Sequence, residues 1–220
     1  MKPTRLSLAT TLLLAVSAAG AGMALARPLP EQPASAEKPA GPKAKPKAKT
    51  PSQDEMMKAW QAYATPGESH KKLEKAAGTW NTKVRTWMDP SKPPEETEGT
   101  NVGTMVLGGR YLEEKYEGTM MGQPFHGVGL TGYDNYKKKY VGTWADSMGT
   151  GIMMMTGSFD KSGKVMTSWG TMDDPIMKKT VKVKSVTTIV DDDTHRFEMW
   201  NTGPGGKMVK SMEMVYTRKK

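Results

Sequence analysis

Few residues of this chain have the chemistry of a catalytic or metal-binding group. Histidine occurs only as His70, His126 and His195, and cysteine is absent. A hydrolytic zinc site needs several converging His or carboxylate ligands, and no HExxH or His-x-His spacing occurs. A serine triad has no nucleophile elbow here, and thiol catalysis and disulfides both need cysteine. We therefore expect no enzyme activity, no catalytic residue, no metal site and no cofactor.

Methionine is the other unusual chemical feature, at 19 of 220 residues. Thioethers fill irregular spaces in cores, form adaptable apolar pockets, and bind Cu(I) or Ag(I) when they converge on one face, and all three interpretations stay open. The run Met153 to Met155 argues against chelation, because successive strand side chains point to opposite faces. The clusters are Met120-Met121, Met153-Met154-Met155, and Met208, Met212 and Met214.

The elements that position these residues are predicted to be strands. After Gly78 the apolar pattern has a period of two, and turn sequences such as Gly108-Gly109 and Asp160-Lys161-Ser162-Gly163 interrupt it. The predicted strands are Thr79–Asp89, Glu96–Val106, Arg110–Thr119, Phe125–Tyr133, Lys139–Asp146, Gly151–Phe159, Lys164–Met172, Lys179–Val190, His195–Thr202 and Lys207–Arg218.

Consecutive antiparallel strands without a crossover helix leave two exposed edges unless the sheet closes. The expected fold class is therefore all-β, an antiparallel up-and-down β-barrel of about ten strands. A β-sandwich made from the same strands is the alternative.

A helical pattern precedes the strands, from Gln53 to Ala77. Asp54 is the expected cap of a first helix, and Thr65-Pro66-Gly67-Glu68 resembles the start of a second helix that Gly78 ends. We expect these helices to form a short lid or plug. The large apolar residues of the first helix are Met56, Met57, Trp60 and Tyr63.

Alternation along each strand predicts which side chains face the barrel interior. Several of them are polar and costly to bury unpaired. They either form an internal salt bridge, for example Arg110 with Glu114 or Asp146, or orient the polar end of a ligand in a small-molecule pocket. The predicted ligand-binding residues are Arg110, Glu114, Tyr116, Trp144, Asp146, Trp169, His195, Phe197 and Met212.

The N-terminus has the pattern of an export signal. Lys2 and Arg5 precede an apolar run, Leu6 to Ala19, that is too short to span a membrane, and Ala24-Leu25-Ala26 fits a signal peptidase. We predict a signal peptide over 1–26, a disordered Pro/Ala/Lys-rich tether over 27–52 and a single β-barrel domain over 53–220. A retained amphipathic anchor is the alternative. The expected location is periplasmic or secreted, with no transmembrane span after cleavage.

Most of the net charge of +9 lies in the first 51 residues. In the folded part Lys137 to Lys139 are offset by Asp191 to Asp193 and other acidic residues. A nucleic-acid-binding module concentrates basic and aromatic residues on one face, so we expect no nucleic-acid partner. The lysines of the tether either bind an anionic envelope polymer or lipid surface, or only keep the linker solvated.

The stretch from Leu107 to Gly151 contains LGGR-Y, G-x-P-F-x-G, GYD and W-x-D in that order. This order resembles a bacterial domain-of-unknown-function family, the one numbered 1579, which has no assigned activity. Gly78-Thr79-Trp80 on the first strand resembles the G-x-W of calycins, the class of lipocalins, fatty-acid-binding proteins and nitrobindins. The resemblance implies a calycin-like barrel whose floor is closed by Arg218 stacked on Trp80.

The resemblance to nitrobindins, which hold haem through a histidine, implies His195 as an axial ligand and His126 as a second one. We regard a haem-binding barrel as the third interpretation. The first is an exported, tethered, non-catalytic barrel that binds a small apolar or amphipathic molecule in the cell envelope. The second is a structural or protein-interaction barrel with a filled interior, acting through its rim loops and N-terminal helices.

Overall fold

The computed structural model describes residues 50–175 and 177–220, so the predicted signal peptide and nearly all of the predicted tether lie outside the described residues. Ten strands follow two α-helices and one short 3-10 helix. No helix within the described ranges is both long enough and apolar enough to cross a membrane.

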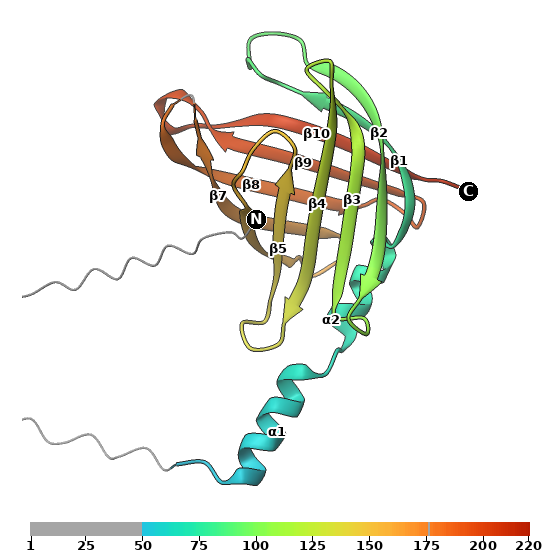
Figure 1. The fold of residues 1–220 in the computed structure, drawn as a ribbon, viewed down its shortest axis with the longest axis vertical. Coiled ribbons are helices and arrows are strands. Elements are labelled where there is room, and N and C mark those ends of the chain that lie inside the picture. The colour runs from blue at the N-terminus through green and yellow to red at the C-terminus, as the bar shows by residue number, and fades with distance from the viewer. Residues whose placement is uncertain (1–49, 176) are drawn as a thin grey trace, which may run out of the picture. The chain divides into compact units, whose positions relative to one another are not determined.

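Each strand pairs antiparallel with the next one along the chain, and β10 returns to pair with β1. This closed sheet (Figure 1) confirms the predicted up-and-down barrel and excludes the β-sandwich. The strands are β1 (Gly78–Thr86), β2 (Glu95–Val106), β3 (Tyr111–Met120), β4 (Gln123–Asp134), β5 (Lys139–Asp146), β6 (Met153–Phe159), β7 (Val165–Asp174), β8 (Lys179–Ile189), β9 (Thr194–Thr202) and β10 (Met208–Arg218).

The first strand shows how alternation sorts side chains between the two faces. Trp80, Thr82 and Val84 face inward and are buried, whereas Asn81 and Lys83 between them and Arg85 after them are exposed. The pairing of β1 with β10 places Met214 and Tyr216 on the same inner face. This is the orientation that the sequence predicts for both strands.

The floor of the barrel forms where β1 begins and β10 ends. The guanidinium carbon of Arg218 lies 4.0 Å from the centroid of the Trp80 ring, as predicted, and the His195 ring lies 4.5 Å from it. Arg218 also donates hydrogen bonds to the carbonyl oxygens of Ala77 and Lys75, at 2.8 and 3.0 Å. The last strand is thus fastened both to the first strand and to the segment before it.

That segment is the predicted plug. It comprises α2 (Glu68–Lys71) and the 3-10 helix η1 (Lys72–Ala76). Leu73 of η1 is buried in one cluster with Leu112 and Tyr140, and the Tyr140 hydroxyl donates to the carbonyl of Ser69 at 2.9 Å. The plug closes the floor end, so the opposite end, where β1 meets β2 and β5 meets β6, is the mouth.

The first helix, α1 (Gln53–Ala64), differs from the prediction in two ways. Its cap is Ser52, not Asp54, because the Ser52 hydroxyl accepts from the Glu55 amide while the Glu55 carboxylate accepts from the Ser52 amide. None of its residues is buried, so α1 is not part of the plug. It projects beyond the floor end (Figure 1).

Glycines inside the strands provide room for aromatic rings of neighbouring strands. A Cβ atom at Gly127 would lie 2.1 Å from Cζ2 of Trp144, and one at Gly99 would lie 2.3 Å from the Tyr116 hydroxyl. On the outer face, a Cβ at Gly132 would lie 2.5 Å from Tyr111. Within the LGGR-Y to W-x-D stretch, Gly127 and Gly132 are therefore packing positions that aromatic rings cover, whereas Gly108, Gly109 and Gly122 have positive φ in the turns.

We expect Arg218→Met to lower the free energy of unfolding by about 2–4 kcal/mol, because the substitution leaves carbonyl acceptors unpaired and uncovers Trp80. Urea denaturation followed by circular dichroism measures the change. Arg196→Met is the matched control, since Arg196 is exposed on the neighbouring strand β9. Equal losses in the two variants would show that the floor contact does not stabilise the barrel.

We expect Gly127→Ala to displace the Trp144 ring and to cost about 1–3 kcal/mol of stability. The near-ultraviolet circular dichroism of the folded protein should change together with the denaturation midpoint. Gly151→Ala is the control, because a Cβ atom there meets nothing within 4 Å. An unchanged near-ultraviolet spectrum for Gly127→Ala would contradict the described position of the Trp144 ring.

Candidate functional site

A polar cluster lies inside the barrel above the floor. The register of β1, β2 and β3 places Thr82, Asn101 and Glu114 on the inner face. The side-chain amide of Asn101 donates a hydrogen bond to Oε1 of Glu114 at 3.1 Å. Tyr216 of β10 lies directly across from Thr82 and completes the cluster.

The cluster favours uncharged side chains. Burial raises the pKa of the Glu114 carboxyl above its usual 4.5, although the bond from Asn101 opposes this effect. Burial also raises the pKa of Tyr216 well above its ordinary value, and the neighbouring Glu114 and Tyr116 add to the shift. The surroundings of Glu114 therefore favour its protonated form, which can donate a hydrogen bond as well as accept one.

Three inward-facing polar atoms are buried without a hydrogen-bond partner among the described residues: Thr82 Oγ1, His195 Nε2 and Asn201 Oδ1. An unpaired buried polar atom costs about 1–3 kcal/mol, so proteins rarely keep one without a reason. Burial lowers the pKa of His195, and the positive charge of Arg218 lowers it further, so the neutral imidazole is favoured. All three atoms are available to a polar group inside the barrel.

Toward the mouth the inner face becomes apolar and partly accessible. Trp144 lies on the inner face opposite Gly129, Phe197 opposite Thr187, and Met212 opposite Met199. Trp144, Phe197 and Met212 are half-buried, as are Met153 and Met155 of β6. Trp144, Phe197 and Met212 pack against the buried cluster of Val84, Tyr116, Phe125 and Met214 and still keep accessible surface.

Asp146 lies at the mouth, at the end of β5. Its Oδ2 accepts a hydrogen bond from the Trp144 indole at 2.9 Å, and its Oδ1 accepts from the Met148 amide at 3.0 Å. These bonds fix the orientation of the Trp144 ring on the wall. Asp146 thus positions an aromatic residue and does not pair with a basic one.

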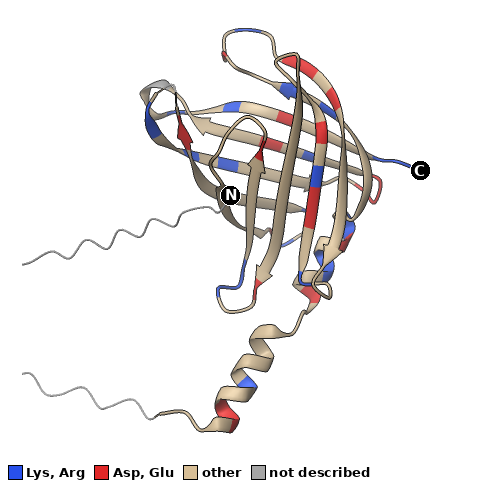
Figure 2. Ribbon diagram, viewed as in Figure 1, with Lys and Arg blue, Asp and Glu red and all other residues tan. Residues whose placement is uncertain are grey.

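Acidic residues predominate among the charged residues that face inward at the mouth. Glu95 lies opposite Thr86 of the inner face, and Asp174 lies opposite Lys179 at the end of β7. Figure 2 shows acidic residues at the start of β2 and at the ends of β5 and β7. With Asp146 and Glu114, four carboxyl groups share the inner face with Lys179 at the rim and Arg218 at the floor.

The structure places most of the predicted ligand-binding residues on the inner face, but two predictions of orientation were wrong. Trp169 faces outward and is 50% exposed, with the Lys184 ammonium 5.8 Å from its ring. Its small neighbours Ser168 and Gly170 face inward instead. Hydrophobicity favours the interior for Trp169, whereas the strand places its small neighbours there.

Arg110 does not reach the interior either. It precedes β3 in the turn, where its guanidinium donates to the carbonyl oxygens of Ala64 and Leu107 at 3.0 and 3.1 Å. The proposed pairing with Glu114 or Asp146 is therefore absent. Predicting the strand to begin one residue too early assigned Arg110 to the inner face.

The residues that sequence reasoning did not select for the site are Asn101, Thr82, Tyr216 and Asn201. Thr82 and Tyr216 face inward by the alternation of β1 and β10, so their role in the cluster required only the pairing of these two strands. Asn101 lies across the sheet from Tyr116, a contact that depends on the β2–β3 register. The length of the intervening Gly-Gly turn is the signal that could have fixed that register.

The two histidines of the haem interpretation lie apart. His126 is exposed on the outer face of β4, and His195 is buried at the floor beside Trp80. Within residues 50–175 and 177–220, no group of three or more histidine or carboxylate side chains could hold a metal ion. The described histidines therefore do not fit a haem held by two axial ligands.

Two solved structures have a similar fold. The first is Rv2717c from M. tuberculosis, with a TM-score of 0.54 and 15% identity over 71% of this chain and 100% of that one. The second is the S-type phycobiliprotein lyase CPES from Guillardia theta, with a TM-score of 0.50 and 12% identity over 69% of this chain and 93% of that one. At such identities the similarity extends to the fold alone.

No curated protein sequence matches the chain. The model of the family described as "Protein of unknown function (DUF1579)" matches residues 65–218. The matched region begins after α1 and includes the plug, all ten strands and Arg218 of the floor. On this match, the chain belongs to the DUF1579 family.

Proposed function

We propose that this protein is a non-catalytic binding protein that holds a small amphipathic molecule, neutral or positively charged, inside its barrel. The observation that carries the proposal is the uneven burial of the inward-facing side chains. Trp80 at the floor and Val183 in the mouth half of β8 are 1% and 0% exposed, whereas Trp144, Phe197 and Met212 face inward and keep accessible surface. Accessible apolar surface inside the closed sheet favours a ligand site over a fully filled barrel.

The polar end of the ligand would lie against Glu114, Asn101 and Thr82. Protonated Glu114 offers a donor, and Thr82 Oγ1 is buried without a partner. A hydroxyl, amide or amine group can use both atoms. The apolar body would then lie along Trp144, Phe197 and the methionines Met153, Met155 and Met212, in the usual arrangement of a small-molecule pocket.

The inner charges argue against a carboxylate ligand. Arg218 is engaged at the floor with Trp80 and two backbone carbonyls, and Lys179 lies at the rim opposite Asp174. An anionic head group would therefore meet carboxyl groups without a nearby free cation in the described barrel. A neutral or cationic head group avoids this cost.

The proposal includes export. The charged start, short apolar run and Ala24-Leu25-Ala26 site support cleavage of a signal peptide, and the Pro/Ala/Lys-rich segment supports a tethered barrel in the envelope. N-terminal sequencing of the protein from a bacterial envelope fraction or medium tests this part. A mature N-terminus at Arg27 is expected, and an intact Met1 would contradict it.

We expect the neutral fluorescent probe N-phenyl-1-naphthylamine to bind more tightly than the anionic probe 11-(dansylamino)undecanoic acid. Trp144→Ala should weaken binding of the neutral probe by about tenfold to hundredfold, because it removes an aromatic wall of the site. Fluorescence titration measures both affinities. Trp169→Ala is the matched control, since it removes an exposed ring from the outer face.

Equal effects of Trp144→Ala and Trp169→Ala, or no binding of either probe, would overturn the interior site. Tighter binding of the anionic probe would overturn the inferred ligand charge while leaving an interior site in place.

We expect Glu114→Gln to become more stable relative to the unchanged protein as the pH rises above 4.5. The folded-state pKa of Glu114 is raised, so the unfolded chain releases this proton first and stability falls with rising pH until the folded carboxyl also ionises. Glutamine cannot ionise and escapes this loss. Urea denaturation across a pH series measures the difference, and Glu117→Gln on the outer face of β3 is the control. A difference that does not vary with pH would contradict the inferred burial.

A further inference from the structure

The helix α1 presents an uncovered apolar face. Met57 and Trp60 are 65% and 66% exposed, Met56 and Tyr63 are exposed as well, and no residue of the helix is buried. The barrel therefore does not explain why these four positions are apolar. An exposed tryptophan within an apolar patch is common at interaction surfaces.

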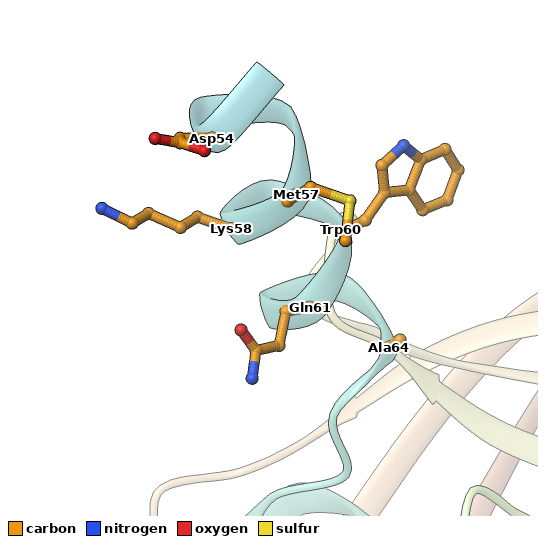
Figure 3. Close-up of a pocket in the computed structure, with 6 residues that line it drawn as sticks. All are labelled: Asp54, Met57, Lys58, Trp60, Gln61 and Ala64. Atoms are coloured by element: carbon orange, nitrogen blue, oxygen red, sulfur yellow. The ribbon is translucent and has the colours of Figure 1, made fainter. Parts of the chain in front are cut away.

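The face is a continuous stripe. Met56, Trp60 and Tyr63 follow the spacing of three and four residues that aligns side chains along a helix. Figure 3 shows Asp54, Lys58 and Gln61 pointing to one side and Trp60 to the other. Side chains on opposite sides of one helix enclose no pocket, so this is an amphipathic surface.

The barrel holds α1 at its C-terminal end. The side-chain amide of Asn135, in the β4–β5 turn, donates to the carbonyl oxygens of Ala62, Tyr63 and Thr65 at 3.3, 3.0 and 2.8 Å. The guanidinium of Arg110 donates a hydrogen bond to the carbonyl oxygen of Ala64 at 3.0 Å. These four hydrogen bonds from side chains to backbone carbonyl oxygens fix the end of the helix beside that turn.

The β4–β5 turn extends the apolar face. Tyr136 is 85% exposed and lines one shallow groove together with Met56, Trp60 and Tyr63. We call α1 and residues 134–138 together the helix–turn surface. It combines tryptophan, tyrosine and methionine, side chains that tolerate the boundary between water and hydrocarbon.

Lysines occur in the turn of the helix–turn surface and in the sequence before α1. Lys137, Lys138 and Lys139 belong to the turn and the start of β5, and Lys43, Lys45, Lys47 and Lys49 precede the helix in the sequence. Like charges around an apolar patch oppose the pairing of two copies and attract an anionic surface.

We propose that the helix–turn surface docks on a lipid bilayer that contains anionic headgroups. Met56, Trp60, Tyr63 and Tyr136 would enter the interfacial layer while Lys137, Lys138 and Lys139 meet the headgroups, and Asp54 and Gln61 would face water. The helix α1 precedes the region that matches the family, whereas residues 134–138 lie within it, so the helix part of this surface is an addition to the family's barrel. The proposal does not depend on a ligand in the interior.

Vesicle flotation tests the proposal, with the protein as purified from expressing cells and its N-terminus determined by mass spectrometry. The vesicles contain phosphatidylglycerol mixed with phosphatidylcholine, or phosphatidylcholine alone. Binding is expected with the anionic vesicles and should weaken with added salt. The triple variant Met56→Ser, Trp60→Ser, Tyr63→Ser should bind the anionic vesicles at least about tenfold more weakly than the unchanged protein does.

The matched control is Val102→Ser, Val128→Ser, Leu130→Ser, which removes three exposed apolar side chains from the barrel wall. It should bind as the unchanged protein does. Lys137→Gln, Lys138→Gln, Lys139→Gln should weaken binding to anionic vesicles only. Because α1 contains no buried residue, the helix variant should keep the thermal midpoint of the unchanged protein.

Equal binding of the helix variant and the unchanged protein overturns the proposal, as does a failure of the unchanged protein to float with anionic vesicles. Light scattering of the protein without lipid measures its oligomeric state and provides a further test. A dimer that forms without lipid and is lost in the helix variant would mean that a second copy covers the surface, which also overturns the proposal.

Discussion

Closure of the sheet between β1 and β10 is the constraint on which the rest of the molecule depends. The first and last strands carry Trp80 and Arg218, whose stacked contact lies at the point of closure. Arg218 also binds carbonyl oxygens of the segment before β1, so the contact that closes the sheet also fixes η1 across its lower end. A single arginine therefore connects three parts of the chain, and one end of the barrel is sealed as a result.

The shape of the interior follows from glycine as much as from large residues. Gly127 and Gly129 let the Trp144 ring lie against β4, and Gly99 and Gly118 do the same for Tyr116. Rings that lie along the wall leave more of the middle open than rings that point across it. The polar cluster around Glu114 and the accessible apolar surface near Phe197 occupy the inner face together, as an amphipathic ligand requires.

The fold could be predicted because its signals are local. A period of two with regular turns gives ten strands, and the position of Trp80 and Arg218 at the two ends gives the floor. Contacts across the sheet were harder to predict from the sequence, since the Asn101–Glu114 hydrogen bond depends on the register of β2 and β3. The sequence does not give the orientation of Trp169, because hydrophobicity favours the interior although its small neighbours occupy it. It does not give that of Arg110, because one residue decides where a strand starts. The apolar stripe of α1 could be predicted from spacing, but spacing does not tell what covers a stripe.

The direction of the barrel axis relative to α1 has a consequence for the exchange of a ligand between the barrel and its surroundings. The chain enters β1 and leaves β10 at the sealed end, and α1 is held by the two turns at that same end, through Arg110 and Asn135. A membrane or other surface that bound the protein through α1 would leave the mouth of the barrel pointing away from that surface. Loading and unloading would then take place from the surrounding aqueous phase, and diffusion through water, not lateral transfer from that surface, would limit the rate at which the barrel fills.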